Sequence, residues 1–197
     1  MKILRIARRS SSTIALCVAL SPVPAQAHLN STGMGPVYDG LIHFFTSPED
    51  AIPVLAIALI AGLRGASYGR RALFVLPSAW VLGGFLGLTK SATNGSGVAS
   101  ALWFLLLGGL VAADARLSLS AVTVVVAFLG LHHGFLNGAG MGVSDAATGV
   151  VLGLASAVFV LVALAAAFVV RLRAEWARIA VRVVGSWIAA SGILMRC

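Results

Sequence analysis

Two kinds of residue are scarce in this 197-residue chain: cysteine occurs twice, and charged residues make up only 10% of the sequence. Disulfide scaffolds and thiolate metal centres need several closely spaced cysteines, so Cys17 and Cys197 alone exclude both. A soluble domain carries about 25% charged residues, so an ordinary water-soluble globule is excluded as well. With 59% apolar residues and a mean hydropathy of +1.01, the remaining class is a polytopic membrane protein.

Acidic residues are also scarce, because 6 Asp and Glu face 14 Lys and Arg and give a formal net charge of +8. A basic excess can indicate a nucleic-acid-binding protein. Here the basic residues are scattered between apolar runs and form no dense patch. We therefore expect no nucleic-acid partner.

Residues 1–27 have the three parts of a secretory signal peptide: a basic start, an apolar run over Thr13–Leu20, and the small-residue cleavage site Ala25-Gln26-Ala27. The apolar run is too short for the ~30 Å hydrocarbon core, although a first transmembrane helix is the alternative. Cleavage would leave ten basic against six acidic residues and lower the net charge from +8 to +4. The mature chain would begin at His28, outside the membrane.

The mature chain, residues 28–197, is predicted to be one all-α domain with about six transmembrane helices in a bundle. A polar, glycine-containing stretch, Leu29–Thr46, precedes the first of them. Several apolar segments are shorter than the ~20 residues of a straight span, but they suffice when tilt is small or flanking residues snorkel. The predicted spans are Pro48–Leu63, Ala72–Thr89, Val98–Ala113, Leu119–Leu136, Ala146–Val170 and Trp176–Met195.

The arginines orient this bundle. If the mature amino terminus is periplasmic, the loops after the first, third and fifth spans are cytoplasmic and hold seven basic residues, against two on the other side. This distribution obeys the positive-inside rule and predicts a bacterial inner-membrane protein. The seven are Arg64, Arg70, Arg71, Arg116, Arg171, Arg173 and Arg178, and the two are Lys90 and Arg196.

Glycines recur four residues apart in and beside the predicted spans, which is typical of helices whose backbones approach closely in a membrane. We interpret this pattern as general helix packing. The pairs are Gly83 and Gly87, Gly130 and Gly134, Gly138 and Gly142, and Gly149 and Gly153.

Every histidine and four of the six acids fall on the predicted periplasmic side. Imidazoles and carboxylates without thiolates suit a borderline divalent cation such as Ni²⁺, Co²⁺ or Zn²⁺. The candidate metal ligands are His28, His43, Glu49, Asp50, His132 and His133, with Asp39, Asn137 and Asp145 in support.

The segment Ser47-Pro48-Glu49-Asp50 also has the pattern of a helix start. Ser47 would be the N-cap, Pro48 would occupy the first turn, and Asp50 would complete a capping box. Capping and ion binding are compatible, because one acid can cap while the other faces inward. His43 precedes this start, and it is either a ligand over the helix entry or an interfacial histidine.

His132 and His133 are neighbours near the end of one predicted span, about 100° apart around the helix. At least one of them should face the bundle interior, where polar residues are functional candidates. Asn137 follows His133 by four residues on the same face. The alternative is a histidine that only bonds a backbone carbonyl. His28 would offer both its imidazole and a new α-amine after cleavage.

Several segments resemble the HupE/UreJ family of hydrogenase and urease accessory membrane proteins. The resemblance extends over essentially the whole mature chain and implies a signal peptide, about six helices and a nickel or cobalt permease. It rests on His28-Leu29, Gly33-x-Gly35-Pro36-Val37-Tyr38-Asp39-Gly40-x-x-His43-Phe44, Ser47-Pro48-Glu49-Asp50, Ala61-Gly62-Leu63-Arg64-Gly65, Leu106-Leu107-Gly108-Gly109-Leu110-Val111-Ala112-Ala113-Asp114 and His133-Gly134-x-x-Asn137-Gly138.

The family motif H-P-x-x-G-x-D-H has a divergent counterpart here. His43 matches its first histidine, Glu49 stands where the aspartate would be, and Asp50 replaces the final histidine. This exchange makes the implied site harder and richer in oxygen, so the sequence indicates a divergent branch of the family.

The predicted function is therefore inward transport of a divalent metal ion, nickel or cobalt from the resemblance, for metalloenzyme maturation. The lipid bilayer, the transported ion and maturation proteins are the expected partners, with no tightly bound cofactor and no enzymatic activity. The alternative is an accessory factor that assists hydrogenase or urease assembly without transport. A serine nucleophile at Ser96 and a haem held by His132 and His133 are both disfavoured, since the first lacks the serine-protease pattern and adjacent histidines cannot ligate one iron from both sides.

Overall fold

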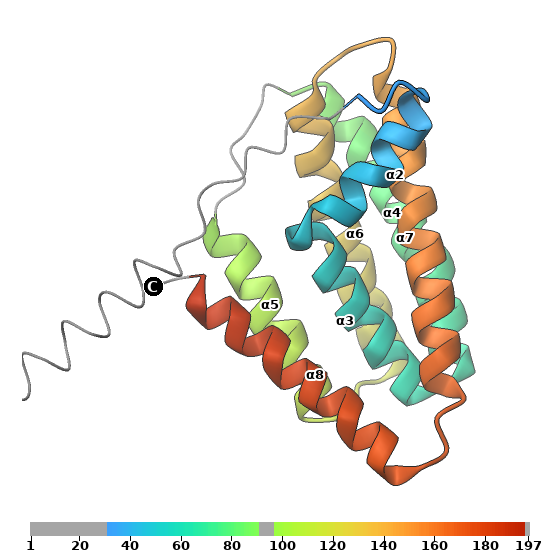
Figure 1. The fold of residues 1–197 in the computed structure, drawn as a ribbon, viewed down its shortest axis with the longest axis vertical. Coiled ribbons are helices and arrows are strands. Elements are labelled where there is room, and N and C mark those ends of the chain that lie inside the picture. Colours follow the sequence, from blue (N-terminus) through green and yellow to red (C-terminus); the bar gives the residue numbers. More distant parts are fainter. Residues whose placement is uncertain (1–30, 91–96, 196–197) are drawn as a thin grey trace, which may run out of the picture.

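A computed structural model describes residues 31–90 and 97–195, and the regular structure of these residues is all helical, which confirms the all-α part of the predicted fold class. The predicted signal peptide, His28 and Ser96 lie outside the described residues. The described helices are α2 (Pro36–Thr46), α3 (Pro48–Arg64), α4 (Ala66–Leu88), α5 (Gly97–Ala112), α6 (Leu119–Met141), α7 (Ala147–Val170) and α8 (Glu175–Leu194) (Figure 1).

Helix α2 is a correction to the sequence analysis, which treated Leu29–Thr46 as a polar stretch before the first span. Pro36 occupies the first turn of α2, where its fixed φ suits a helix and its missing N–H costs no hydrogen bond. Phe44 is fully buried, and Gly40 lies against the backbone of Val150 in α7. Tertiary packing against α7 therefore stabilises a helix of 11 residues that would be marginal alone.

The chain bends by 77° between α2 and α3. Pro48 disfavours helical backbone at the residue before it, and Ser47 is accordingly extended with φ −104° and ψ 92°. The Thr46 hydroxyl donates to the carbonyl oxygens of Ile42 and His43 in the last turn of α2, and the His43 oxygen is one that the end of the helix leaves without its usual donor. The proline thus separates α2 from α3 and leaves Ser47 and Asp50 buried at the start of α3, while Pro48 and Glu49 are exposed.

Four described helices, α4, α6, α7 and α8, are each long and apolar enough to cross a membrane. Counted together as one bent span, α2 and α3 are also long and apolar enough, so the number of candidate spans rises to five. Helix α5, the predicted span Val98–Ala113, has 16 residues in the part of the chain that the structure describes, fewer than the ~20 of a straight span. The described residues therefore confirm a polytopic helical membrane architecture but not the predicted six spans.

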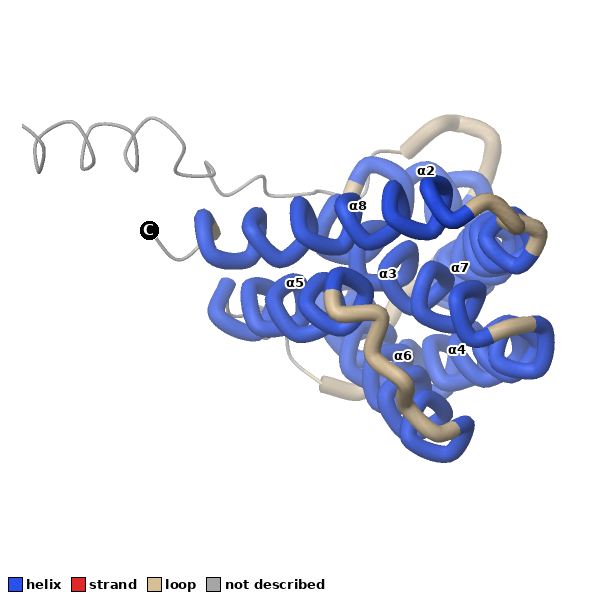
Figure 2. The backbone as a smooth tube through the Cα atoms, turned by 90° about the horizontal axis from the view of Figure 1, so that it is seen from below, coloured by secondary structure: helices blue, strands red, loops and turns tan. Residues whose placement is uncertain are grey.

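Helix α3 lies in the middle of the bundle and contacts every other described helix (Figure 2). The other six form three pairs in which glycine lets two backbones meet. In α4 and α6, a Cβ on Gly134 would overlap the Trp80 carbonyl oxygen, and one on Gly83 would overlap that of Leu131. The same holds for Gly153 in α7 against Val37 in α2, and for Gly108 in α5 against Ala189 in α8.

The predicted glycine pattern is therefore mostly confirmed, with one exception. Gly142 ends α6 with φ +65° and has open space around its Cβ position, so it terminates a helix rather than packing one. The loops that follow α3, α5 and α7 lie at one end of the bundle (Figure 1). We call this the basic end.

Candidate functional site

Asp50 is a buried carboxylate in the first turn of α3, only 5% exposed. Its backbone N–H donates to the Ser47 carbonyl oxygen at 3.0 Å, which starts the helix as predicted. Ser47 is the N-cap, but its side chain makes no capping hydrogen bond, so the predicted capping box is wrong. The Asp50 carboxylate turns into the bundle instead, while the neighbouring Glu49 is exposed.

Two residues of α6 hold this carboxylate. His133 Nδ1 lies 2.8 Å from Asp50 Oδ1, and Asn137 donates from Nδ2 to Asp50 Oδ2 at 3.0 Å. Asn137 Nδ2 also donates to the His133 carbonyl oxygen at 2.9 Å. His133 and Asn137 share a helix face because they are four residues apart. Asp50, His133 and Asn137 therefore form one connected group, which we call the Asp50 cluster.

The Asp50 cluster fixes the orientation of the imidazole. An ionised Asp50 can only accept, so the Nδ1 hydrogen of His133 donates to it. In neutral His133 the lone pair is then on Nε2, and this atom is buried without a hydrogen-bond partner among the described residues. A carboxylate on one imidazole nitrogen and a free lone pair on the other is the arrangement found behind histidine metal ligands.

Aromatic rings surround the histidines, and the sequence analysis did not identify them. The ring centroids of Trp80 in α4 and Trp103 in α5 lie 5.7 Å and 6.2 Å from that of His133. Trp80 Nε1 is also buried without a partner within the described parts of the chain. Trp103 Nε1 donates to His132 Nδ1 at 3.2 Å. His132 thus faces α5, whereas His133 faces α3.

His43 reaches the same region from α2. Its Nε2 lies 3.5 Å from the Ser47 hydroxyl, at the limit of a hydrogen bond, and Ser47 is only 2% exposed. Ser47 precedes Asp50 by three residues around the bend. His43 is therefore placed at the start of α3 near the Asp50 cluster, and within the described structure it contacts Ser47 rather than the cluster itself.

The remaining predicted ligands lie elsewhere. Asp39 accepts hydrogen bonds from the backbone N–H and the hydroxyl of Thr32, at 2.6 Å and 2.7 Å, so it orders the turn before α2. Asp145 is exposed in the loop between α6 and α7. Among residues 31–90 and 97–195, no three His, Cys, Asp or Glu side chains form a group that could hold a metal ion.

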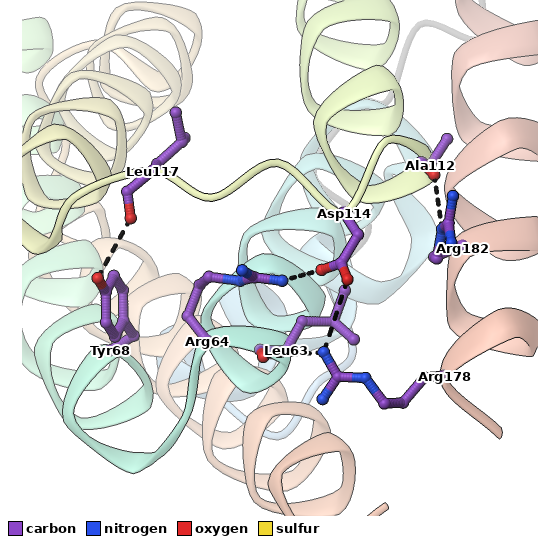
Figure 3. A network of polar contacts seen from close by, with 8 residues as sticks. All are labelled: Leu63, Arg64, Tyr68, Ala112, Asp114, Leu117, Arg178 and Arg182. Carbon is purple, nitrogen blue, oxygen red and sulfur yellow. Dashed lines mark hydrogen bonds and ion pairs between the residues drawn. The ribbon is translucent and has the colours of Figure 1, made fainter. Parts of the chain in front are cut away.

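A second polar group occupies the basic end (Figure 3). Asp114, just after α5, forms an ion pair with Arg64 at the end of α3 and lies 3.6 Å from Arg178 of α8. Arg182 of α8 donates from Nε to the Ala112 carbonyl oxygen at 2.9 Å. Cations thus satisfy carbonyl groups and the negative dipole at helix carboxyl ends.

Residues 15–195, which include the Asp50 cluster and Asp114, match the sequence profile of a family described as HupE / UreJ protein. The chain belongs to the HupE/UreJ family. Protein HupE of Rhizobium leguminosarum bv. viciae is 30% identical over 156 residues, which span 77% of this chain and 79% of that protein. No solved structure matches the chain.

Membership of the HupE/UreJ family confirms the resemblance found in the sequence. Together with four long apolar helices, it establishes a membrane protein of a family linked to hydrogenase and urease accessory roles. Within this HupE/UreJ chain, the Asp50 cluster joins residues 83 positions apart in the sequence. It is the buried polar group that the candidate function has to explain.

Proposed function

We propose that this protein carries a divalent transition-metal cation, nickel or cobalt, from the periplasm to the cytoplasm across the bacterial inner membrane, for use in metalloenzyme maturation. The proposal rests on one observation about the His133 ring. Its Nε2 is buried without a hydrogen-bond partner among the described residues, while its Nδ1 is held by Asp50. Burying such polar groups in a membrane bundle is costly and marks an ion pathway by default.

In this proposal His133 is the ligand, and Asp50 is the residue that positions it. Both Asp50 oxygens are occupied, one by His133 and the other by Asn137. The ion, as cargo, would exchange some of its water for His133 Nε2, a nitrogen donor that suits Ni²⁺ and Co²⁺. His43 at the bend, together with His28 of the preceding sequence, would collect the hydrated ion first.

The membrane potential is a sufficient driving force for the proposed direction. One elementary charge gains about 2.3 kcal/mol per 100 mV when it moves inward, and a dication gains about twice as much. The basic end orients the protein with its arginines in the cytoplasm. A positive ion that entered near the Asp50 cluster would therefore leave on the cytoplasmic side, which is the direction that the membrane potential favours.

The test uses the two adjacent histidines as a matched pair. We expect His133→Gln to lower saturable uptake of radioactive nickel or cobalt into proteoliposomes at least tenfold, because it removes the free Nε2. His132→Gln should change uptake less than threefold, since that side chain bonds Trp103 of α5. Circular dichroism and thermal unfolding would show that both variants fold.

Equal uptake by wild type and His133→Gln would refute the assignment of the ligand. Wild-type protein that binds nickel in detergent but transports none in liposomes would refute transport itself. That second result would instead favour a membrane accessory factor for hydrogenase or urease assembly.

A further inference from the structure

A groove lies between the start of α4 and the end of α7, at the basic end of the bundle. Its volume is about 250 Å³, and small or apolar residues form most of its lining. Gly69, Val162 and Ala166 are buried at its floor, while Ala66 and Ala167 are exposed at its rim. The groove therefore opens on the outer surface of the helix pair and not into the bundle.

That outer surface is apolar and belongs to two helices that are long enough to span a membrane. Leu164 and Phe168 of α7 are 68% and 65% exposed beside the groove, so this face requires lipid around it. Phe74 of α4 and Phe159 of α7 are in ring contact with centroids 6.4 Å apart. This contact comes just after the groove residues along α4 and just before them along α7, so it closes the inner end of the groove.

Two arginines, Arg70 of α4 and Arg171 after α7, line the opposite end of the groove. Both are exposed, and neither guanidinium group has an ion-pair or hydrogen-bond partner among the described residues. The Asp114 carboxylate, at the same end of the bundle, is already paired with Arg64. Two uncompensated guanidinium groups at a membrane interface attract a phosphate, which arginine binds in a bidentate manner.

We propose that this groove binds one anionic glycerophospholipid of the cytoplasmic leaflet. The headgroup phosphate contacts Arg70 and Arg171, and one acyl chain lies along the floor toward the Phe74–Phe159 contact. Nine residues separate Val162 from Arg171, so the helical wall is about 13 Å long at 1.5 Å per residue. A soluble phosphate would leave this apolar wall uncovered, so the occupant is a lipid. The site is independent of the proposed ion transport.

The chain provides a matched control for the charges, because Arg71 and Arg173 lie one and two residues from the groove arginines without lining it. The double variants Arg70→Gln/Arg171→Gln and Arg71→Gln/Arg173→Gln remove the same charge from the same end. Native mass spectrometry of each purified protein, titrated with phosphatidylglycerol or phosphatidylcholine, gives the affinity for the first bound lipid.

Wild type should prefer phosphatidylglycerol. Arg70→Gln/Arg171→Gln should weaken its binding about 30-fold, on the basis of the usual contribution of two basic residues near an anionic lipid surface. Arg71→Gln/Arg173→Gln should weaken it less than threefold. Ala163→Leu, which fills the groove and keeps every charge, should also weaken phosphatidylglycerol binding, and it decides the question if the charge variant does not fold.

Three results would overturn the proposal. Equal losses in the two double variants would mean a general surface attraction rather than a site. Unchanged binding in Ala163→Leu would mean that no acyl chain occupies the groove. Competition by millimolar inorganic phosphate would identify a free phosphate as the occupant in place of a lipid.

Discussion

Asp50 and Asp114 are both carboxylates, but the side chains that bind them differ in chemistry. Asp50 is held inside the bundle by an imidazole and an amide, from His133 and Asn137. Asp114 is held at the basic end by the guanidinium groups of Arg64 and Arg178. Arginine stays protonated in proteins, whereas histidine can be neutral or charged and can bind a metal.

Because their partners differ, the contacts of Asp114 are structural, whereas the charge of the group around Asp50 can change. The arginines keep their charge, so their contact with Asp114 can tie α3, α8 and the loop after α5 together in one arrangement. The charge of the Asp50 cluster depends on what His133 binds. A cation at Nε2 would increase the positive charge on the imidazole and strengthen its hydrogen bond to Asp50.

The substitution expected to separate the two carboxylates most strongly is Asp50→Asn, and its effect is on transport. We predict that saturable nickel or cobalt uptake falls tenfold to a hundredfold, as is typical when the residue that orients a metal-binding histidine is changed. Glu49→Gln is the matched control, because Glu49 is adjacent in sequence but exposed. It should change uptake less than twofold in the same liposome assay. Comparable losses in both variants would remove the distinction between buried and exposed acid.

The next effect is on stability, by Asp114→Asn. Asp114 has φ +48°, a left-handed conformation that asparagine also adopts readily, so this variant removes the charge and keeps the backbone. We predict a loss of about 2 kcal/mol in unfolding free energy, the usual contribution of a hydrogen bond to a charged group. Thermal or denaturant unfolding in detergent measures it. The ion concentration for half-maximal uptake should stay within twofold, and a tenfold change would show that the basic end also handles the ion.

The smallest effect is expected from Arg182→Gln. This exposed side chain makes one hydrogen bond to the Ala112 carbonyl oxygen, so its loss should cost about 1 kcal/mol or less. The melting temperature of the variant should therefore lie between those of wild type and Asp114→Asn. A larger loss than that of Asp114→Asn would mean that the helix-end contact, and not the ion pair, holds α5 to α8.

Much of the helical architecture follows from the sequence because apolar runs and glycine spacing are local signals. Helix α2 did not follow, since an 11-residue segment with Asp39 and Gly40 lacks the length and apolarity of a span. What stabilises it is the backbone contact of Gly40 and Gly153 across the α2–α7 pair. A glycine pattern predicts that two backbones meet but not which two.

The candidate site was predictable to a similar degree. Helical spacing places His133 and Asn137 on one face, and the adjacency of His132 and His133 predicts that one of them turns inward. The sequence has no signal for the pairing with Asp50, which depends on how α3 is rotated against α6. Nor did it indicate Trp80 and Trp103, because aromatic residues within apolar runs are indistinguishable from ordinary packing residues.

The three glycine-packed pairs have a mechanical consequence. They reduce the described bundle to three two-helix units around a central rod, α3, and each unit resists sliding because its backbones interlock. Asp50 belongs to the rod and His133 to the α4–α6 unit. Their 2.8 Å contact is therefore a joint between two separate parts. A change at His133 Nε2 acts on that joint directly, and the rod connects it to the basic end.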